Sequence, residues 1–139
     1  MVAFPALGFR GLWVTESDVN NDFSVVVHNQ GGASVVAVSG ELDLRTSPEL
    51  EERLASAFDA GAELVILDLR QIEFMDSTGL RVLLGAHQRA SESGRRFALV
   101  RGADQVERVL TLTGVRDLLT VVDSPEELLA ADEQLSEGA

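Results

Sequence analysis

The chain has 139 residues, a length typical of one domain with a single hydrophobic core. Its net charge of −12 at pH 7 argues against binding to nucleic acid or to an anionic membrane surface, because both depend on a basic protein face. It has no cysteine and all 11 basic residues are arginines, which excludes disulfides, thiolate metal sites, a cysteine nucleophile, a P-loop lysine and a Schiff base.

Residues 1–22 combine apolar side chains with Gly and Pro and then become polar, without a regular period. We interpret them as an N-terminal extension and not as a secondary-structure element. It is expected to be either a flexible, loosely held tail or an apolar patch for self-association, so the chain is expected to be a monomer or a weak dimer. The segment lacks the features of a signal peptide, and no apolar run approaches the ~20 residues that span a bilayer, which favours a cytoplasmic protein without membrane contact.

From residue 23 onward, β-forming runs alternate with helical patterns. The runs at 23–29 and 33–40 predict an antiparallel hairpin, because Gln30-Gly31-Gly32 separates them. The run at 63–70 is apolar on both faces and predicts an interior strand. Shorter runs predict strands at 96–100 and 118–122.

Four helices are predicted between and after these strands, at 46–61, 77–94, 103–114 and 123–135. Ser47 or Thr46 is expected to cap the first helix, with Pro48 in its first turn and Gly61 at its end. The last helix begins with a Ser124-x-x-Glu127 capping box. The buried stripes are expected to be Leu50, Leu54, Ala57 and Phe58 in the first helix, Leu80, Leu83, Leu84 and His87 in the second, and Val106, Val109 and Leu110 in the third.

The resulting order is β-β-α-β-α-β-α-β-α, which predicts an α/β fold with a mixed sheet flanked by helices. The domain is expected to cover residues 23–131, with residues 132–139 as a C-terminal tail.

The start of the second helix differs from the others. The polar sequence Asp76-Ser77-Thr78-Gly79 precedes Arg81, whereas the other helices carry acids in their first turn. A cation near the positive end of a helix costs ~0.3–1 kcal/mol, but it becomes favourable when an anion binds the free N–H groups there. The simpler interpretation is that Asp76 or Ser77 is an N-cap worth ~1 kcal/mol. Both interpretations remain open at this point.

Catalysis by Ser77 is disfavoured by its surroundings. A nucleophile elbow requires Gly-x-Ser-x-Gly, and Met75 stands in place of the first Gly. His87 is roughly 15 Å further along the same helix at ~1.5 Å per residue, so it cannot act as the base, and the distance of His28 from Ser77 is open. Two histidines without cysteines also provide no compact metal cluster. The chain is therefore expected to be no enzyme and to need no metal or cofactor.

Three segments together resemble the STAS domain of bacterial anti-sigma factor antagonists: SGELDLRTSPELEERL at 39–54, LVILDLRQIEFMDSTGLRVLL at 64–84, and residues 96–129. The resemblance extends over about residues 23–131 and implies a STAS-type sheet and helix order. The motif DSTGL is short, but GELD upstream and the matching order of elements make the resemblance specific. Many members of that family have Gly where Arg81 stands, and residues 1–22 are not part of the family pattern.

The resemblance implies a binding protein that regulates transcription by partner switching, as in bacterial stress responses. Unphosphorylated, such a protein binds an anti-sigma factor that is also a serine kinase, and a sigma factor is released. Phosphorylation of one serine ends this binding, and a PP2C-type phosphatase reverses it. By position in the motif, the phosphorylated serine is Ser77, the adjacent acid is Asp76 and the acid of the upstream loop is Asp43. Thr78, Gly79 and Arg81 are expected to complete the partner-binding site.

Two other functions remain to be distinguished from this one. A STAS domain can act as a scaffold or regulatory subunit of a stress or transport complex, in which case Ser77 is not phosphorylated. A hydrolase based on Ser77 is the enzymatic alternative, and it lacks a base. Nucleotide binding, found in some relatives, has no phosphate-loop signature here. Asp76 and Asp43 are expected either to recognise a partner or to cap neighbouring N–H groups.

Overall fold

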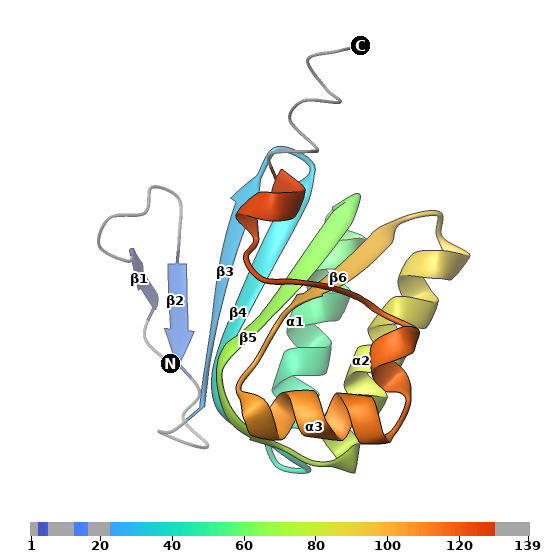
Figure 1. The fold of residues 1–139 in the computed structure, drawn as a ribbon. Coiled ribbons are helices and arrows are strands. Elements are labelled where there is room, and N and C mark those ends of the chain that lie inside the picture. Colours follow the sequence, from blue (N-terminus) through green and yellow to red (C-terminus); the bar gives the residue numbers. More distant parts are fainter. Residues whose placement is uncertain (1–2, 6–12, 17–22, 130–139) are drawn as a thin grey trace.

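The computed structural model describes residues 3–5, 13–16 and 23–129, in which seven strands form one sheet whose spatial order follows the chain (Figure 1). The strands are β1 (Ala3–Pro5), β2 (Trp13–Glu16), β3 (Ser24–Gln30), β4 (Ala33–Leu42), β5 (Leu64–Met75), β6 (Arg96–Val100) and β7 (Thr120–Val122). The helices are α1 (Ser47–Asp59), α2 (Ser77–Glu92) and α3 (Asp104–Leu112), followed by the 3-10 turn η1 (Val115–Asp117). Strands β1 to β4 pair antiparallel, and β4 to β7 pair parallel. The predicted α/β class and mixed sheet are confirmed.

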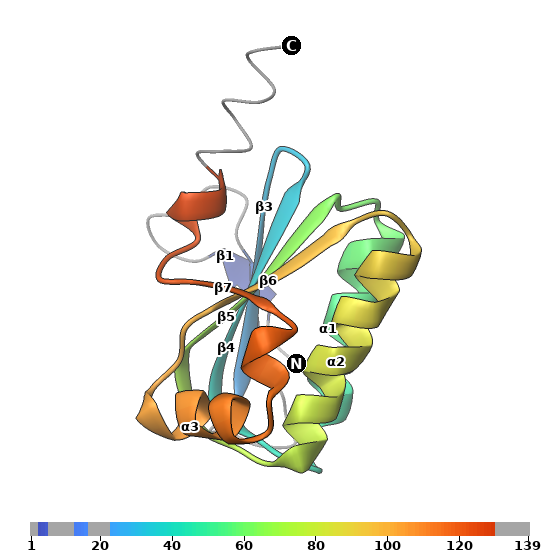
Figure 2. The same ribbon diagram turned by 45° about the vertical axis from the view of Figure 1, so that its right-hand side comes forward.

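The helices lie mainly on one side of the sheet. Figures 1 and 2 show α1 and α2 side by side against one face, with α3 at the lower end of the molecule. The residues from Glu126 to Leu129 are helical and belong to the opposite side, where Leu128 and Leu129 pack against a second apolar cluster. That cluster consists of Ala33, Leu64, Ile66 and Val100. Both faces of the central strands are therefore covered.

Strand β5 is the centre of the core, as its apolar run predicts. Residues 64–69 are all buried, because β4 and β6 flank the strand and apolar layers cover both faces. Asp68 is the charged exception, at 8% exposure, and it accepts a 2.7 Å hydrogen bond from Nη2 of Arg70. This bonding to Asp68 raises the pKa of Arg70, so the guanidinium stays charged.

Two predicted glycine turns are also confirmed: the turn of the β3–β4 hairpin and the turn after α1. Gln30 pairs with Ala33, so Gly31 and Gly32 form a two-residue hairpin loop, with Gly31 at φ 61°. Helix α1 ends at Asp59, and Gly61, two residues later, has φ 97° and donates to the carbonyl of Phe58 at 3.0 Å. The N–H of Ala62 reaches the carbonyl of Ala57 at 3.2 Å, which completes a Schellman motif.

The interpretation of residues 1–22 as free of secondary structure is wrong, since β1 and β2 extend the sheet beyond β3. These strands have 3 and 4 residues, too few to produce a detectable period. The unpaired N–H and C=O groups of β3 offer an edge on which even a short segment can form a strand. The proposed flexibility and self-association of this segment concern residues that lie mostly outside the described ranges.

The strand predicted at 63–70 continues to Met75. Residues 71–75 pair with the end of β4, and the register of this pairing shifts twice. In this part of the strand the exposed Gln71 and Glu73 flank the buried Ile72. The strand predicted at 118–122 begins only at Thr120, because the 3-10 turn η1 precedes it. The end of the helix predicted at 123–135, the domain end at 131 and the tail lie outside the described residues.

Two details of the helices also differ from expectation. Neither Thr46 nor Ser47 caps α1 with its side chain, because the hydroxyl of Thr46 is used in the preceding loop. The buried face of α2 contains Gly79, Val82, Ala86 and Ala90 beside Leu80 and Leu83, whereas Leu84 and His87 are only half-buried. The buried face of α2 is therefore rotated from the predicted face towards Gly79, Ala86 and Ala90. These small residues allow the helix to pack closely against the rest of the core. The capping box is present in part, since Glu127 accepts from the N–H of Ser124 at 3.0 Å.

Candidate functional site

The residues singled out from the sequence meet at one end of the sheet. Strands β4 and β5 are parallel, and their last residues, Leu42 and Met75, are register partners. The loop with Asp43 follows the first strand and the Asp76-Ser77 segment follows the second. The N–H of Asp76 donates to the carbonyl of Leu42 at 3.2 Å, which links the two loops directly. This is the carboxyl edge of the parallel strands, where ligand and partner sites of α/β sheets commonly form.

Asp76 is the N-cap of α2. Its Oδ1 accepts hydrogen bonds from the N–H groups of Thr78 at 2.9 Å and Gly79 at 3.2 Å, and its backbone is extended. The first turn contains no acid, as predicted, but the cap itself is an acid. From the sequence we considered free N–H groups at this helix start that an anion could bind. Two of these N–H groups are not free, because they already donate to Asp76.

Asp43 holds its loop together in the same way. Its Oδ1 accepts from the N–H groups of Arg45 at 2.9 Å and Thr46 at 3.3 Å. The buried hydroxyl of Thr46 donates to the carbonyl of Glu41 at 2.7 Å and accepts from the N–H of Asp43 at 3.0 Å. Of the two roles considered for Asp43, capping of neighbouring N–H groups is the one that the hydrogen bonds show.

Gly79 allows α2 to approach the strand ends. A Cβ at this position would lie 2.7 Å from Cγ of Met75 and 3.0 Å from Cγ of Leu42, closer than side-chain atoms pack. Gly79 is buried and Thr78 is half-buried, so neither offers much surface. The glycine of the motif therefore positions the helix start against β4 and β5.

Gln105 also supports the site, and nothing in the sequence indicated it. From the first turn of α3 its Oε1 accepts from the N–H of Met75 at 3.1 Å, and its Nε2 donates to the carbonyl of Met75 at 3.3 Å. Within β5, strand β6 pairs with residues 64–68 and not with Met75, so this amide replaces a strand partner for the end of β5. The contact joins residues 30 positions apart, which no local pattern reveals.

Four exposed residues of the segments that meet here, Leu44, Phe74, Ser77 and Arg81, are called the Ser77 surface. Ser77 and Arg81 are four residues apart on α2 and therefore share a helix face. Arg81 forms no ion pair in the part of the chain that the structure describes. Leu44 is 73% exposed and Phe74 is 42% exposed, which is unusual for large apolar side chains beside a polar loop. From the sequence we did not single out Leu44 or Phe74. Their positions, directly after GELD and two residues before DSTGL, could have indicated them.

Neither histidine of the chain lies beside Ser77. Its side chain is exposed, and its hydroxyl has no hydrogen-bond partner among the described residues. His28 is paired with Val35 near the hairpin end of β4, and His87 is half-buried further along α2. In the described ranges no group of three or more His, Cys, Asp or Glu residues could hold a metal ion. An exposed hydroxyl at a helix start can accept a phosphate, and neither histidine is placed to act as its base.

None of the helices in the described ranges is long and apolar enough to cross a membrane.

The sequence and the structure were compared with those of known proteins. Residues 24–128 match the family model of the STAS domain. An anti-sigma-B factor antagonist of Staphylococcus aureus is 33% identical over 91 residues, which cover 66% of this chain and 84% of that protein. The crystal structure of an anti-sigma factor antagonist from Mycobacterium paratuberculosis is similar with a TM-score of 0.72 and 28% identity, covering 78% of this chain and 92% of that one.

The fold is also that of SpoIIAA, an anti-sigma factor antagonist of Bacillus, in two states. The unphosphorylated form has a TM-score of 0.68 and 20% identity, covering 79% of this chain and 96% of that one. The phosphorylated form has a TM-score of 0.62 and 19% identity, covering 77% of this chain and 97% of that one.

Proposed function

Because this chain belongs to the STAS domain family and its relatives include anti-sigma factor antagonists, we propose that it binds an anti-sigma factor and that phosphorylation of Ser77 ends this binding. The anti-sigma factor is the serine kinase in this scheme, and a PP2C-type phosphatase restores the unphosphorylated protein. The chain has no catalytic activity of its own and works in the cytoplasm. The observation that carries the proposal is the exposed hydroxyl of Ser77 at the start of α2, which no described residue hydrogen-bonds.

The Ser77 surface has the composition of a small protein contact. Leu44 and Phe74 supply apolar area, and Arg81 supplies a charge that is not paired with any residue in the described ranges. Association would bury these side chains and pair Arg81 with an acid of the anti-sigma factor. Asp43, Asp76, Thr78 and Gly79 support this surface by holding the two loops and the helix start in place.

A phosphate on Ser77 affects the contact more than the fold. It adds about −1.5 to −2 charges at pH 7, next to a helix N-terminus and four residues before Arg81, where an anion is tolerated. The carboxylate of Asp76, which precedes Ser77 in the chain, repels it. In a contact with Leu44 and Phe74, however, the phosphate would have to lose its hydration without a designated partner. The similarity of this chain to both states of SpoIIAA supports a fold that is the same with and without the modification.

The experiment is a binding measurement with the unmodified protein, Ser77→Ala and Ser77→Asp. Proteins from the source cells that bind the Ala variant are identified by mass spectrometry, and the affinity of the recovered anti-sigma factor for each form is then measured with purified components. We expect the Ala variant to bind as well as the unmodified protein and the Asp variant to bind at least about tenfold more weakly, since a charge in an apolar contact costs more than about 1.4 kcal/mol.

Thr78→Ala is the matched control, because it removes the adjacent hydroxyl. Incubation of the recovered kinase with ATP should phosphorylate the Thr78→Ala variant and leave Ser77→Ala unmodified. Equal binding of the Ala and Asp variants, together with the absence of phosphate on Ser77, would contradict the switch and favour a scaffold role. Circular dichroism of the phosphorylated protein is expected to be unchanged, and loss of α2 would overturn the proposed mechanism.

A further inference from the structure

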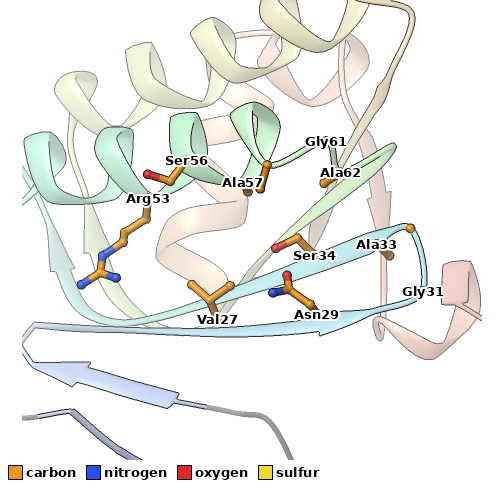
Figure 3. A pocket seen from close by; sticks show the side chains of 12 residues that line it. Val27, Asn29, Gly31, Ala33, Ser34, Arg53, Ser56, Ala57, Gly61 and Ala62 are labelled. Carbon is orange, nitrogen blue, oxygen red and sulfur yellow. The ribbon is translucent and has the colours of Figure 1, made fainter.

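A cleft of about 370 Å³ lies far from the Ser77 surface, between α1 and the β3–β4 hairpin (Figure 3). Its lining includes Val27, Asn29, Ser34, Arg53, Ser56 and Ala57. It extends to the hairpin turn at Gly31, next to the first residue of β4. The Ser77 surface lies beside the last residue of β4, Leu42, and the strand between the two ends is about 30 Å long at ~3.3 Å per residue. The volume is at the lower end of the range of about 300–1,000 Å³ that small molecules occupy in proteins.

Ser34 is the first unexplained feature of this cleft. It is only 2% exposed, and its Oγ has no hydrogen-bond partner. Figure 3 shows its side chain on the side of β4 that faces α1, beside Asn29, its register partner on β3. A buried hydroxyl without a partner costs about 1–3 kcal/mol, which an alanine here would avoid. Because the Oγ atom is itself buried, the side chain has to turn before the hydroxyl can bind a group that enters from the cleft.

Arg53 is the second unexplained feature. It is half-buried on α1 and, in Figure 3, extends from the helix towards the strands, at the opposite end of the cleft from Gly31. The chain has 23 acidic residues, yet no described carboxylate forms an ion pair with Arg53. Even Glu49, one turn earlier on the same helix, forms none with it. A partly desolvated guanidinium without a counter-charge favours a carboxylate or a phosphate.

From these two features we propose that the cleft binds a small hydroxylated organic anion, with its carboxylate or phosphate on Arg53 and a hydroxyl on Ser34 and Asn29. Val27 and Ala57 contact the carbon skeleton between these ends. Because the cleft shares no residue with the Ser77 surface, this binding is independent of the proposed partner switch, and either can fail without the other.

The test is a titration of the full chain, followed by the NMR signals of its backbone amides. Three probes separate the contributions: glycerol 3-phosphate carries anion and hydroxyls, inorganic phosphate only the anion, and glycerol only hydroxyls. Glycerate in a fourth titration distinguishes carboxylate from phosphate. We expect glycerol 3-phosphate or glycerate to shift the amides of Gly31, Ser34 and Gly61 at millimolar concentration. Inorganic phosphate should bind more weakly and glycerol not measurably.

Variants test whether the cleft is the binding site of the organic anion. Arg53→Gln should weaken binding of the organic anion about tenfold, as expected for a lost charge-assisted contact. Arg108→Gln, on the exposed side of α3, changes the net charge equally and should leave binding unchanged. Ser34→Ala should weaken binding severalfold while it raises the midpoint of thermal unfolding, because it removes the unpartnered hydroxyl. The absence of amide shifts in the cleft, or equal binding by Arg53→Gln and Arg108→Gln, would overturn the proposal.

Discussion

Single carboxylates organise the Ser77 site. Asp76 and Asp43 each accept two backbone N–H groups of the residues that follow them, one at the start of α2 and one in the loop after β4. An acid in such a position is held by the backbone and presents one face of its carboxylate to solvent. Partner recognition by these carboxylates is a proposal, and substitutions can separate it from capping.

Asp76→Ala is expected to lower the free energy of unfolding by about 1 kcal/mol, because it removes the cap of α2. Asp76→Asn should cost much less, since Asn caps a helix nearly as well as Asp. Urea denaturation of both variants measures the difference. If Asp76→Asn keeps its stability and loses affinity for the anti-sigma factor, the charge itself recognises the partner. Equal destabilisation by Ala and Asn would show that the cap contributes nothing beyond its charge.

Among the secondary-structure elements, the N-terminus of α2 is pressed against the ends of β4 and β5. Gly79 makes this approach possible, because a side chain there would collide with both strands. Gly85, further along the same helix, is exposed, and a Cβ at that position would have no neighbouring atom within 4 Å. The two glycines thus have opposite roles within one helix.

Gly79→Ala is expected to destabilise the protein by about 1–3 kcal/mol, because the new methyl group collides with Met75 and Leu42. Gly85→Ala should stabilise it by about 0.5–1 kcal/mol through its higher helix propensity. Thermal or urea unfolding of the two variants provides the comparison. Stabilisation by both substitutions would mean that the start of α2 moves away from the strands without cost.

The contact between α3 and the end of β5 leads to a further expectation. Gln105→Leu leaves the N–H and the carbonyl of Met75 without partners and should cost about 1–3 kcal/mol. Gln105→Glu retains an acceptor for the N–H of Met75 and should cost less. Hydrogen exchange at the amide of Met75 is the specific readout, since it should accelerate in Gln105→Leu. Unchanged exchange there would show that the strand end needs no support from α3.

Across the molecule as a whole, the net charge of −12 acts over distances longer than any contact described above. A long-range field of this sign attracts a basic face on the partner and accelerates the encounter. We expect the association rate with the anti-sigma factor to fall about tenfold or more as ionic strength rises from low to high, while the dissociation rate changes little. Stopped-flow measurements over a salt series test this. A rate that does not depend on salt would remove electrostatic steering from the mechanism.

Local sequence patterns were enough to predict the α/β class, the hairpin at Gly31-Gly32, the interior strand and the position of Ser77 between a strand and a helix. These features depend on periodicity, on glycines at turns and on capping residues, all of which act within a few positions along the chain.

Features that join distant segments emerged only from the folded chain. Pairing on the edge of β3 made strands of Ala3–Pro5 and Trp13–Glu16, packing rotated the buried face of α2, and Gln105 came to support Met75. Folding also brought Ser34 and Arg53 into one cleft. Such contacts depend on which surfaces remain uncovered after the core has formed, and no local pattern encodes that.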